Sequence, residues 1–233
     1  MATDLPATKP VHSMPFVRLE LAVLGVQEDG LQVLLGKRTE APYAGRWALP
    51  GGVLRIDLDA NLEAGCQRVA QERLGCALPH LVQVGAVGAR QRDPRAPWAL
   101  SVVYRCLVPT ERVSAAPGKR LEALKWVPAD EAAADKTLAF DHSALIGQAV
   151  KATRAEIQTL VFPPELLPAQ FTLAELQAAS EAVLGRRLDK SSFRRRVDEA
   201  GCVQPIEGAV RTGAFRPAQL FELTATSTGG SPA

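Results

Sequence analysis

Residues 51–76 contain groups that could hold a phosphate and a metal ion, because a glycine pair is followed by acidic and basic side chains. The run GGVLRIDLDANLEAGCQRVAQERLGC predicts a helix over 61–75, with Asn61 as N-cap and Gly75 after the last turn. Backbone N–H groups at the glycine pair could approach a diphosphate closely. The carboxylates on the helix then decide whether a metal ion can take part.

Those carboxylates are few. Mg2+ prefers carboxylate oxygens that converge from one face of a helix. Val69 lies three residues before Glu72, where a second carboxylate would be needed, and Arg73 brings a competing guanidinium beside Glu72. We therefore expect no catalytic residue, no metal and no cofactor. Acids that could in principle replace the missing ligands, but that fit a solvated loop and helix start better, are Asp57, Asp59 and Glu63.

The same stretch resembles the Nudix box, G-x5-E-x7-R-E-U-x-E-E-x-G-U, in which U is a bulky aliphatic residue. Val69 and Arg73 stand at two of its acids, Leu58 stands at the third, and the loop is two residues longer than the pattern. The resemblance implies Mg2+-dependent cleavage in active members, so hydrolysis of ADP-ribose or another nucleoside diphosphate derivative is the alternative function. The vestigial box consists of Gly52, Arg68, Glu72 and Gly75.

The segments around the box strengthen this resemblance. A W-A-L-P-G-G turn precedes the box, and a hairpin sequence, Glu28-Asp29-Gly30, joins the first two apolar runs. The resemblance implies an α/β fold, a Nudix α/β/α sandwich with a mixed sheet. Strands are expected at 17–26, 31–36, 81–87, 98–108 and 121–127.

The R-D-P-R segment at 92–95 is typical of Nudix domains that handle ADP-ribose and of their non-catalytic relatives. Its arginines could hold phosphates in a bidentate way, and its aspartate could orient a guanidinium or a ribose hydroxyl. An exposed turn with a local ion pair is the alternative. Trp47 and Trp98 are either core residues or a stacking surface for adenine, with the core favoured. The expected ligand-binding residues are Arg38, Arg46, Trp47, Gly51, Gly52, Arg92, Asp93 and Arg95.

Composition indicates an ordinary cytoplasmic protein. The chain has 233 residues, 47% of them apolar, and a net charge of +2. No run reaches the roughly 18 apolar residues that span a bilayer, so no membrane partner is expected. The four cysteines show no C-x-x-C spacing, which favours free thiols over zinc binding or disulfides. His142 begins a helix and is expected to be a capping or packing residue.

The C-terminal third contains a helix-turn-helix pattern. Residues 186–196, RRLDKSSFRRR, carry six basic side chains and one acid. A capping box at 172–175 opens a first helix, and Asp189 can cap a second whose Phe193 and Val197 face inward. Two short helices around a tight glycine turn, the second of them basic, are typical of a DNA recognition helix.

Short strand candidates at 203–207 and 218–223 flank a loop with Gly208 and Gly213, as in a wing. The pattern therefore predicts a small winged helix-turn-helix domain that binds double-stranded operator DNA. A solvated helix face is the alternative for the basic cluster. The expected DNA-binding residues are Arg186, Arg187, Lys190, Ser191, Ser192, Arg194, Arg195, Arg196, Arg211 and Arg216.

Between the two domains, a predicted helix carries Leu145, Ala149, Ala152 and Ile157 on one face. This helix could pair two protomers, and a twofold homodimer would match a palindromic operator. The expected organisation is a flexible leader at 1–15, a Nudix-like ligand-sensing domain at 16–140, a linker and dimerisation helix at 141–160, a winged helix at 161–225 and a flexible tail at 226–233.

Taken together, the chain resembles the Nudix-related transcriptional regulators (NrtR). The resemblance is carried by LPGG, the altered box, RDPR, LAFDH at 138–142, FTLAEL at 171–176 and LDKSSFRR at 188–195. It implies a repressor of NAD or related metabolism, with ADP-ribose or a similar nucleotide as the effector that releases DNA. An active hydrolase and a protein-interaction adaptor remain the alternatives.

Overall fold

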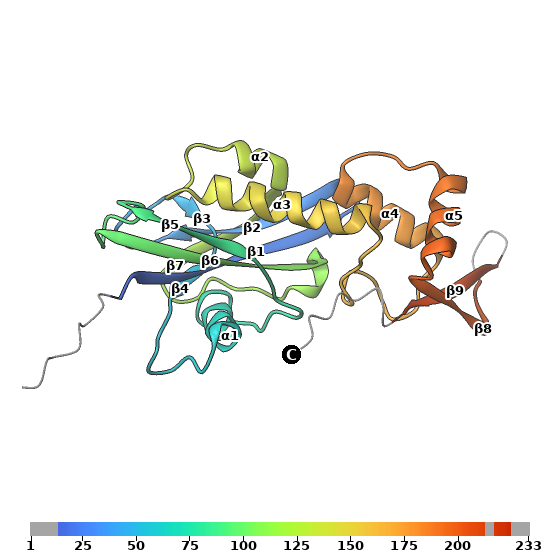
Figure 1. Ribbon diagram of the computed structural model, residues 1–233, viewed down its shortest axis with the longest axis horizontal. Coiled ribbons are helices and arrows are strands. Elements are labelled where there is room, and N and C mark those ends of the chain that lie inside the picture. The colour runs from blue at the N-terminus through green and yellow to red at the C-terminus, as the bar shows by residue number, and fades with distance from the viewer. Residues whose placement is uncertain (1–13, 213–216, 225–233) are drawn as a thin grey trace, which may run out of the picture.

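The structure, a computed structural model, describes residues 14–212 and 217–224. Figure 1 shows a sheet with helices on both faces and a smaller helical unit with a β-hairpin beyond one end. The first unit contains β1 (Phe16–Gln27), β2 (Gly30–Arg38), β3 (Trp47–Ala48), β4 (Gly51–Val53), α1 (Leu62–Leu74), β5 (Val82–Arg90), β6 (Trp98–Pro109), the 3-10 helix η1 (Thr110–Arg112), β7 (Leu121–Pro128), α2 (Ala129–Ala134) and α3 (His142–Gln158). The second contains α4 (Leu173–Leu184), α5 (Lys190–Ala200), β8 (Val203–Arg211) and β9 (Ala218–Leu223).

The sheet is mixed, as predicted. Its order is β3-β2-β1-β6-β5, with β4 also paired to β1 and β7 to β2. The central pair β1 and β6 is parallel, whereas β2, β4, β5 and β7 pair antiparallel with their neighbours. Parallel neighbours need a crossover, and α1 with β5 lies in the chain between them.

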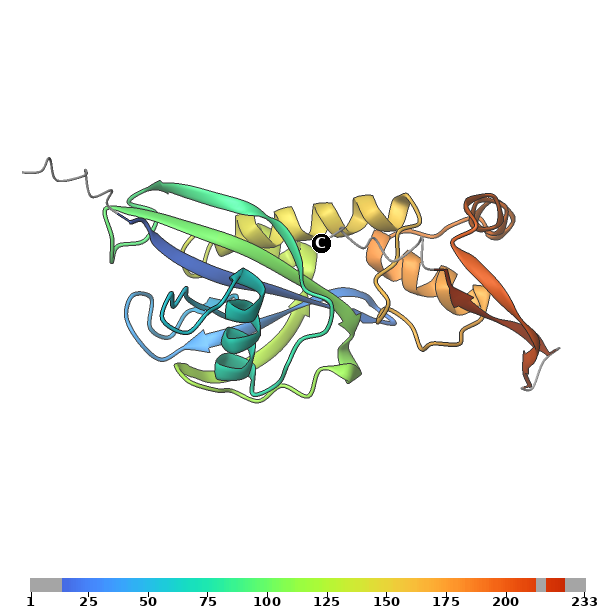
Figure 2. The ribbon, with the colours of Figure 1, turned by 60° about the horizontal axis from the view of Figure 1, so that its bottom comes forward.

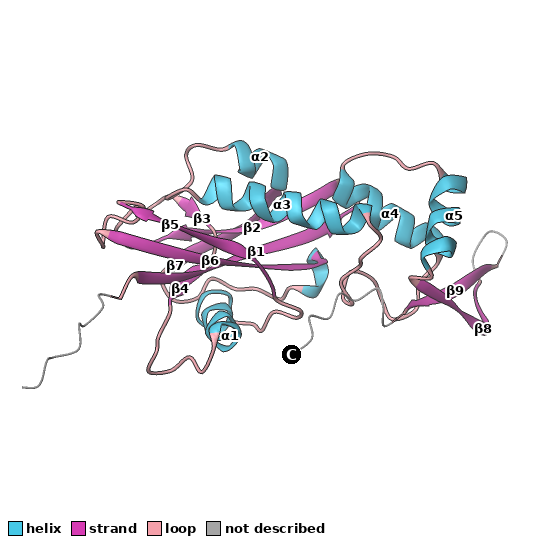
Figure 3. Ribbon diagram, in the orientation of Figure 1, coloured by secondary structure: helices cyan, strands magenta, loops and turns pink. Residues whose placement is uncertain are grey.

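Side chains alternate along β1 and supply two apolar layers. Leu19, Leu21 and Val23 pack with α1, while Ala22 and Leu24 pack on the opposite face with α2 and α3. The two helical layers on opposite faces of the sheet are visible in Figures 1 and 3. The expected α/β/α sandwich is therefore confirmed. The short helix α2 had no counterpart in the sequence predictions.

Local signals place the helix ends. The Asn61 side chain accepts a hydrogen bond from the backbone N–H of Ala64, and Gly75 adopts φ 68° at the end of α1. The capping box before α4 is present, with Thr172 and Glu175 satisfying each other's backbone. Asp189 caps α5 by accepting from the N–H of Ser192.

The apolar face of α3 is used inside the chain. Leu145, Ala149 and Ile157 are buried in the same cluster as α2 and the sheet, and only Ala152 of the predicted stripe is half-buried. Because the sheet already covers this stripe, it is not free to pair two protomers, and a dimer through this helix stays a prediction. A dimer through α3 would have to use the opposite face.

The small unit shares its apolar core with the layer formed by α2, α3 and one face of the sheet. Phe162, Phe171, Phe193 and Val197 join one apolar cluster with Ile157 of α3. Phe171 also exchanges backbone hydrogen bonds with Phe221 of β9, which ties the start of α4 to the hairpin. Figure 2 shows α3 running along the sheet toward the helices of the small unit. In the part of the chain that the structure describes, no helix is long and apolar enough to cross a membrane.

Candidate functional site

An arginine-rich cleft lies where the ends of several sandwich elements meet. Five arginines line it together with Leu49, Gly51 and Leu121. They come from β1, β2, the C-terminal turn of α1, the RDPR turn and the residue before β7. We call this group the arginine cleft; its basic residues are Arg18, Arg38, Arg73, Arg95 and Arg120.

The floor of the arginine cleft is a buried ion pair on β1. Arg18 and Glu20 are two residues apart, so they share one face of the strand, and Arg18 Nε donates to Glu20 Oε1 at 2.6 Å. His142 Nε2 lies 3.8 Å from Glu20 Oε2. Burial would raise the pKa of Glu20, but attraction by Arg18 and His142 outweighs it and lowers this pKa to about 2. The carboxylate therefore stays charged and fixes the Arg18 guanidinium.

An aromatic ring supports the guanidinium groups. Phe140 has the centres of the Arg18, Arg38 and Arg95 guanidiniums 5.6, 5.2 and 5.6 Å from its ring centroid. It reaches this position with φ 54°, a left-handed conformation that is uncommon for a phenylalanine. Its ring also meets Tyr43 edge-on at 4.7 Å.

The LAFDH segment at 138–142 links this ring to α3. Ala139 N–H donates to the carbonyl of Trp47, and His142 Nδ1 accepts the N–H of Leu49 at 2.9 Å. His142 is therefore the expected packing residue, and it joins the LPGG turn to the first turn of α3. The segment fixes the arginine cleft and the start of α3 as one structure.

The two arginines of the RDPR turn have different roles. Arg95 lines the arginine cleft, and buried Asp93 holds it through its backbone N–H and its guanidinium at 3.0, 2.8 and 2.5 Å. Asp93 thus orients a guanidinium, one of the two roles considered for it. Arg92 points elsewhere, to Asp141 at 2.6 and 2.8 Å and to Ser101 at 2.5 Å. Arg92 is thus held within the chain and is not among the residues that line the cleft, so its ligand contact stays a prediction.

The glycine pair serves packing as well as access. Gly51 lines the arginine cleft, and a Cβ there would lie 1.8 Å from Glu20 Oε2. Gly52 instead faces Val69, whose Cγ2 would be 2.7 Å from its Cβ, and both glycines pair with β1. Gly52 therefore has a packing role, and its ligand contact stays a prediction.

Of the three other predicted ligand residues, only Arg38 lines the arginine cleft. Arg38 lines the arginine cleft and donates to the carbonyls of Pro42 and Glu40. Arg46 is exposed and lies over the ring of Tyr43, outside the lining of the cleft. Trp47 packs against the core, with Lys125 Nζ 4.3 Å from its ring centroid. The core alternative is favoured for Trp47, and no contact places Arg46 or Trp47 at the cleft.

The remaining acids of the altered box are bound by an arginine. Arg68 donates to both oxygens of Asp59 at 2.6 and 2.8 Å and to Glu72 at 3.2 Å. Val69, a residue of α1, is fully buried in the apolar cluster between this helix and the sheet. Within the described ranges, no group of three or more His, Cys, Asp or Glu could hold a metal ion. The residues present do not fit the Mg2+ that the Nudix resemblance implies.

Arg73 does not lie where the sequence suggested. It was expected beside Glu72, but its Nε donates to the carbonyl of Gly51 at 2.9 Å and its Nη1 to that of Lys119 at 2.6 Å. Burial and the neighbouring Arg120 lower its pKa from the usual value. The guanidinium faces the arginine cleft, and Arg68 takes the place beside Glu72.

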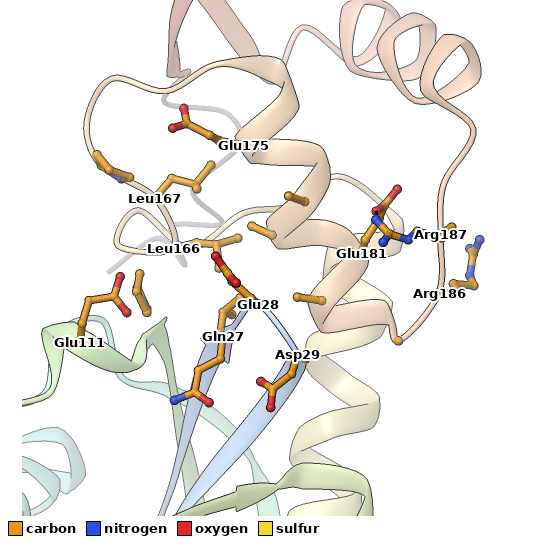
Figure 4. A pocket seen from close by; sticks show the side chains of 18 residues that line it. Gln27, Glu28, Asp29, Glu111, Leu166, Leu167, Glu175, Glu181, Arg186 and Arg187 are labelled. Atoms are coloured by element: carbon orange, nitrogen blue, oxygen red, sulfur yellow. Dashed lines mark hydrogen bonds and ion pairs between the residues drawn. The ribbon is translucent and has the colours of Figure 1, made fainter. Parts of the chain in front are cut away.

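A larger cavity lies elsewhere, at the junction of the two units. It has a volume of about 760 Å³ and lies between the β1–β2 turn, the 166–168 loop and α4, as Figure 4 shows. Its lining has five carboxylates against Arg186 and Arg187, so it repels a diphosphate. The arginine cleft is much smaller, about 30 Å³. Charge, rather than size, favours the arginine cleft as the anion site.

A second basic surface lies on α5. Phe193 and Val197 are buried, and the intervening helix positions turn outward by about 100° per residue. Arg195 is opposite the buried pair, and its nearest carboxylate is Glu199 at 3.8 Å. The exposed predicted residues of this surface are Arg186, Arg187, Lys190, Ser191, Arg194, Arg195 and Arg196, while Ser192 is half-buried.

Three of the predicted DNA-binding arginines are tied within the chain. Arg187 pairs with Glu181 at 2.9 Å, Arg196 donates to the carbonyl of Gln158 at 2.6 Å, and Arg211 pairs with Glu175. Strand β8 is longer than predicted, so Arg211 lies on a strand and not in the loop. Gly213 and Arg216 lie outside the described residues. The basic surface with fewest internal bonds is therefore Arg186, Lys190, Arg194 and Arg195.

Several residues around the arginine cleft were not predicted to belong to a site. Arg18 and Glu20 interrupt an otherwise apolar strand two residues apart, and this spacing could have revealed a buried pair on one face. Phe140 was noted only as part of a resemblance, and His142 was expected to cap or pack without any link to the cleft. Arg120 carries no local pattern that distinguishes it from a surface arginine.

Comparison with known proteins agrees with both units. The NUDIX domain matches residues 18–148, and the NrtR DNA-binding winged helix domain matches 163–223. A protein of Acinetobacter baylyi, the "ADPR responsive transcriptional repressor NtrR", is 35% identical over 215 residues, which cover 92% of this chain and 84% of the relative.

Two crystal structures of Shewanella oneidensis NrtR are also similar. One, complexed with a 27mer DNA, has 30% identity, a TM-score of 0.72, and a match over 91% of this chain and 95% of that one. The other, its NUDIX domain complexed with ADP ribose, has 28% identity, a TM-score of 0.55, and a match over 61% and 90%. From the two matched domains and the full-length relatives, the chain belongs to the NrtR family, in which a Nudix domain is followed by a DNA-binding winged helix.

Proposed function

We propose that this chain is an ADP-ribose-responsive transcriptional repressor that binds operator DNA as a homodimer. The arginine cleft receives the diphosphate of the effector, and α5 with the β8–β9 hairpin binds DNA. The observation that carries the proposal is the position of α3. Its first turn is joined to the arginine cleft through His142 and Phe140, and its last carbonyl holds Arg196 of α5.

The arginine cleft supplies the chemistry for the effector. Guanidinium groups bind phosphate oxygens through paired, charge-assisted hydrogen bonds, and Arg38 and Arg95 are held in place by backbone and carboxylate acceptors. The related Shewanella domain is described in complex with ADP ribose, which supports the same ligand here.

The DNA-binding surface is supported by shape and charge. A capped basic helix after a tight glycine turn can enter the major groove, and exposed arginines can contact phosphates or base edges. The Shewanella relative complexed with DNA spans nearly the whole chain. A twofold dimer would place two such helices on a palindromic site.

Helix α3 gives a route from effector to DNA. An effector shifts DNA binding only if it prefers one of two arrangements of the winged helices. A ligand that moves Phe140 or the LPGG turn also moves the first turn of α3. Nearer the C-terminal end of α3, Arg154 donates a hydrogen bond to the carbonyl of Val183 in α4 at 2.9 Å. A movement of α3 would therefore also move α4. We infer that ADP-ribose disfavours the DNA-binding arrangement.

We also propose that the Nudix unit does not hydrolyse its ligand. Both Asp59 and Glu72 are bound by Arg68, and Val69 removes the carboxylate that would complete a metal site.

The proposal is tested by isothermal titration of the full chain with ADP-ribose, using NAD and AMP as comparison ligands. Saturable binding of ADP-ribose that is lost in Arg38→Ala and kept in Arg46→Ala supports it. Absence of binding to the parent protein, or equal loss in both variants, contradicts the placement of the effector in the arginine cleft.

A further inference from the structure

We propose that the arginine cleft binds its diphosphate as a free anion, with the Arg73 guanidinium taking the place of the metal ion that a Nudix site normally uses. This inference rests on the proposed function and concerns the ionic form in which the effector is bound. It predicts that binding needs no divalent cation.

The first argument is the charge balance of the cleft. Three of its five arginines are neutralised by carboxylates: Arg18 by Glu20, Arg95 by Asp93 and Arg120 by Glu40 at 3.0 Å. In the described part of the chain, Arg38 and Arg73 have only carbonyl acceptors. The local excess is thus two positive charges, which matches a diphosphate carrying one charge on each phosphate.

The second argument is the position of Arg73. It stands at the last acid of the box pattern, a place from which a carboxylate would reach a metal ion. The residue is 8% exposed, and its guanidinium donates to two carbonyls, those of Gly51 and Lys119. Two of its nitrogens are thereby used, which leaves Nη2 and one hydrogen of Nη1 for an anion. The fork is held in place before the ligand arrives.

The third argument is the state of the acids that could have held Mg2+. Asp59 and Glu72 both form ion pairs with Arg68. These hydrogen bonds raise the pKa of the Arg68 guanidinium well above its usual range. A cation would have to displace this guanidinium from both carboxylates. On the cleft side, Arg73 and Arg38 carry the same sign of charge as the cation and would repel it.

A consequence is that Mg2+ competes with the protein. Mg2+ in solution neutralises a diphosphate, and the complex offers less charge to Arg38 and Arg73. ADP-ribose affinity in EDTA should therefore equal or exceed the affinity in millimolar Mg2+. In a metal-bridged site the order would be reversed.

The experiment measures ADP-ribose affinity of the full chain by isothermal titration in EDTA and in Mg2+. We expect equal or up to roughly fivefold weaker binding in Mg2+. Arg73→Gln should bind about 10- to 100-fold more weakly in EDTA, as expected for loss of a charge-assisted contact, while Arg73→Lys should stay within about tenfold of the parent. Arg55→Gln is the matched control, since exposed Arg55 pairs with Asp57 beside the box without lining the cleft.

Thermal unfolding of each variant distinguishes the loss of a ligand contact from the loss of structural support by Arg73. If Arg73 only holds the Gly51 and Lys119 carbonyls, Arg73→Gln lowers the melting temperature and leaves the affinity of the folded protein unchanged, which would overturn the inference. Binding at least tenfold tighter in Mg2+ than in EDTA would also overturn it, while the proposed effector would stand. If the parent fails to bind ADP-ribose under both conditions, the proposed function itself is wrong.

Discussion

The Arg196 guanidinium of α5 donates a hydrogen bond to the carbonyl oxygen of Gln158, the last residue of α3, across 2.6 Å. A cation at the C-terminal end of a helix is favoured by the helix dipole and by an otherwise unpaired carbonyl. One of the basic residues expected to contact DNA thus forms a direct polar link between the second helix of the small unit and α3.

This link predicts different roles for neighbouring arginines of α5. Arg195→Ala should weaken operator binding by about 1–3 kcal/mol if it reads a base, or lower the salt slope by about one unit if it contacts a phosphate. Arg196→Ala should change operator affinity less and should reduce the effect of ADP-ribose on DNA binding. Fluorescence anisotropy with labelled operator, with and without ADP-ribose, measures both quantities.

Neither side chain is needed for packing, so helical circular dichroism should be the same in both variants. Equal losses of operator affinity in the two variants, with an unchanged response to ADP-ribose, would show that Arg196 acts only as a DNA contact. A triple alanine variant that also includes Arg194 and retains parental affinity for operator at moderate salt would reduce the basic cluster to a solvated helix face.

The RDPR turn gives a second prediction. Arg95→Ala should weaken ADP-ribose binding by about 1.5–3 kcal/mol, because the lost contact is charge-assisted. Arg92→Ala should instead destabilise the fold by about 3 kcal/mol, because it leaves Asp141 and Ser101 without their largely buried partner. Calorimetry and thermal unfolding of both variants distinguish the two effects. The assignment fails if Arg92→Ala abolishes ligand binding in a protein of unchanged stability.

Hydrolysis of ADP-ribose should be negligible in Mg2+. Chromatography of the nucleotide after prolonged incubation should recover it intact. Restoring one of the acids with Val69→Glu is expected to destabilise the protein, because Val69 is fully buried against Gly52. Robust turnover by the unmodified protein, abolished by Glu72→Gln, would contradict this expectation.

The Glu20 carboxylate gives a dependence of stability on pH. Its pKa falls from 4.5 to about 2 in the folded chain, so its contribution is present above about pH 4.5 and is lost as the pH falls through about 2. Glu20→Gln should be less stable at pH 7 by about 3 kcal/mol, since buried Arg18 loses its partner. Urea unfolding should show this difference shrinking between pH 4.5 and 2. A constant difference across that range would mean that Glu20 is not held in its charged form.

The sequence predicted the elements whose ends carry local chemistry. Helix α1 begins after Asn61 and ends before Gly75, α4 begins at the capping box of Thr172 and Glu175, and α5 begins after Asp189. These ends were predictable because each of these residues satisfies backbone groups within a few positions. The longer strands were found from their apolar runs, whereas β3 and β4, with two and three residues, were not predicted. Helix α2 was missed because its six residues are too short for a periodic pattern.

The arginine cleft was only partly predictable, because its residues come together through tertiary structure. Arg38 and Arg95 were identified, whereas Arg18, Arg73 and Arg120 meet them only when β1, α1 and the segment before β7 pack. Arg73 shows the limit clearly. Its neighbour in sequence, Glu72, suggested an ion pair, but consecutive helix positions point about 100° apart, and it faces the cleft instead.

The domain boundaries at 140 and 160 and the homodimer stay predictions. The structure places α3 in the sandwich and in the core of the small unit at once, so these two units share one apolar cluster. A sequence pattern could not show this, because the same apolar stripe serves equally well for a dimer or for a sheet.

The most direct test is an electrophoretic mobility shift of DNA upstream of the protein's own gene, titrated with ADP-ribose and, in parallel, with AMP. We expect a specific complex that survives unlabelled competitor DNA and that ADP-ribose dissociates, while AMP does not. A specific complex that ADP-ribose leaves unchanged, in a protein shown by calorimetry to bind ADP-ribose, would contradict the coupling of the arginine cleft to α5.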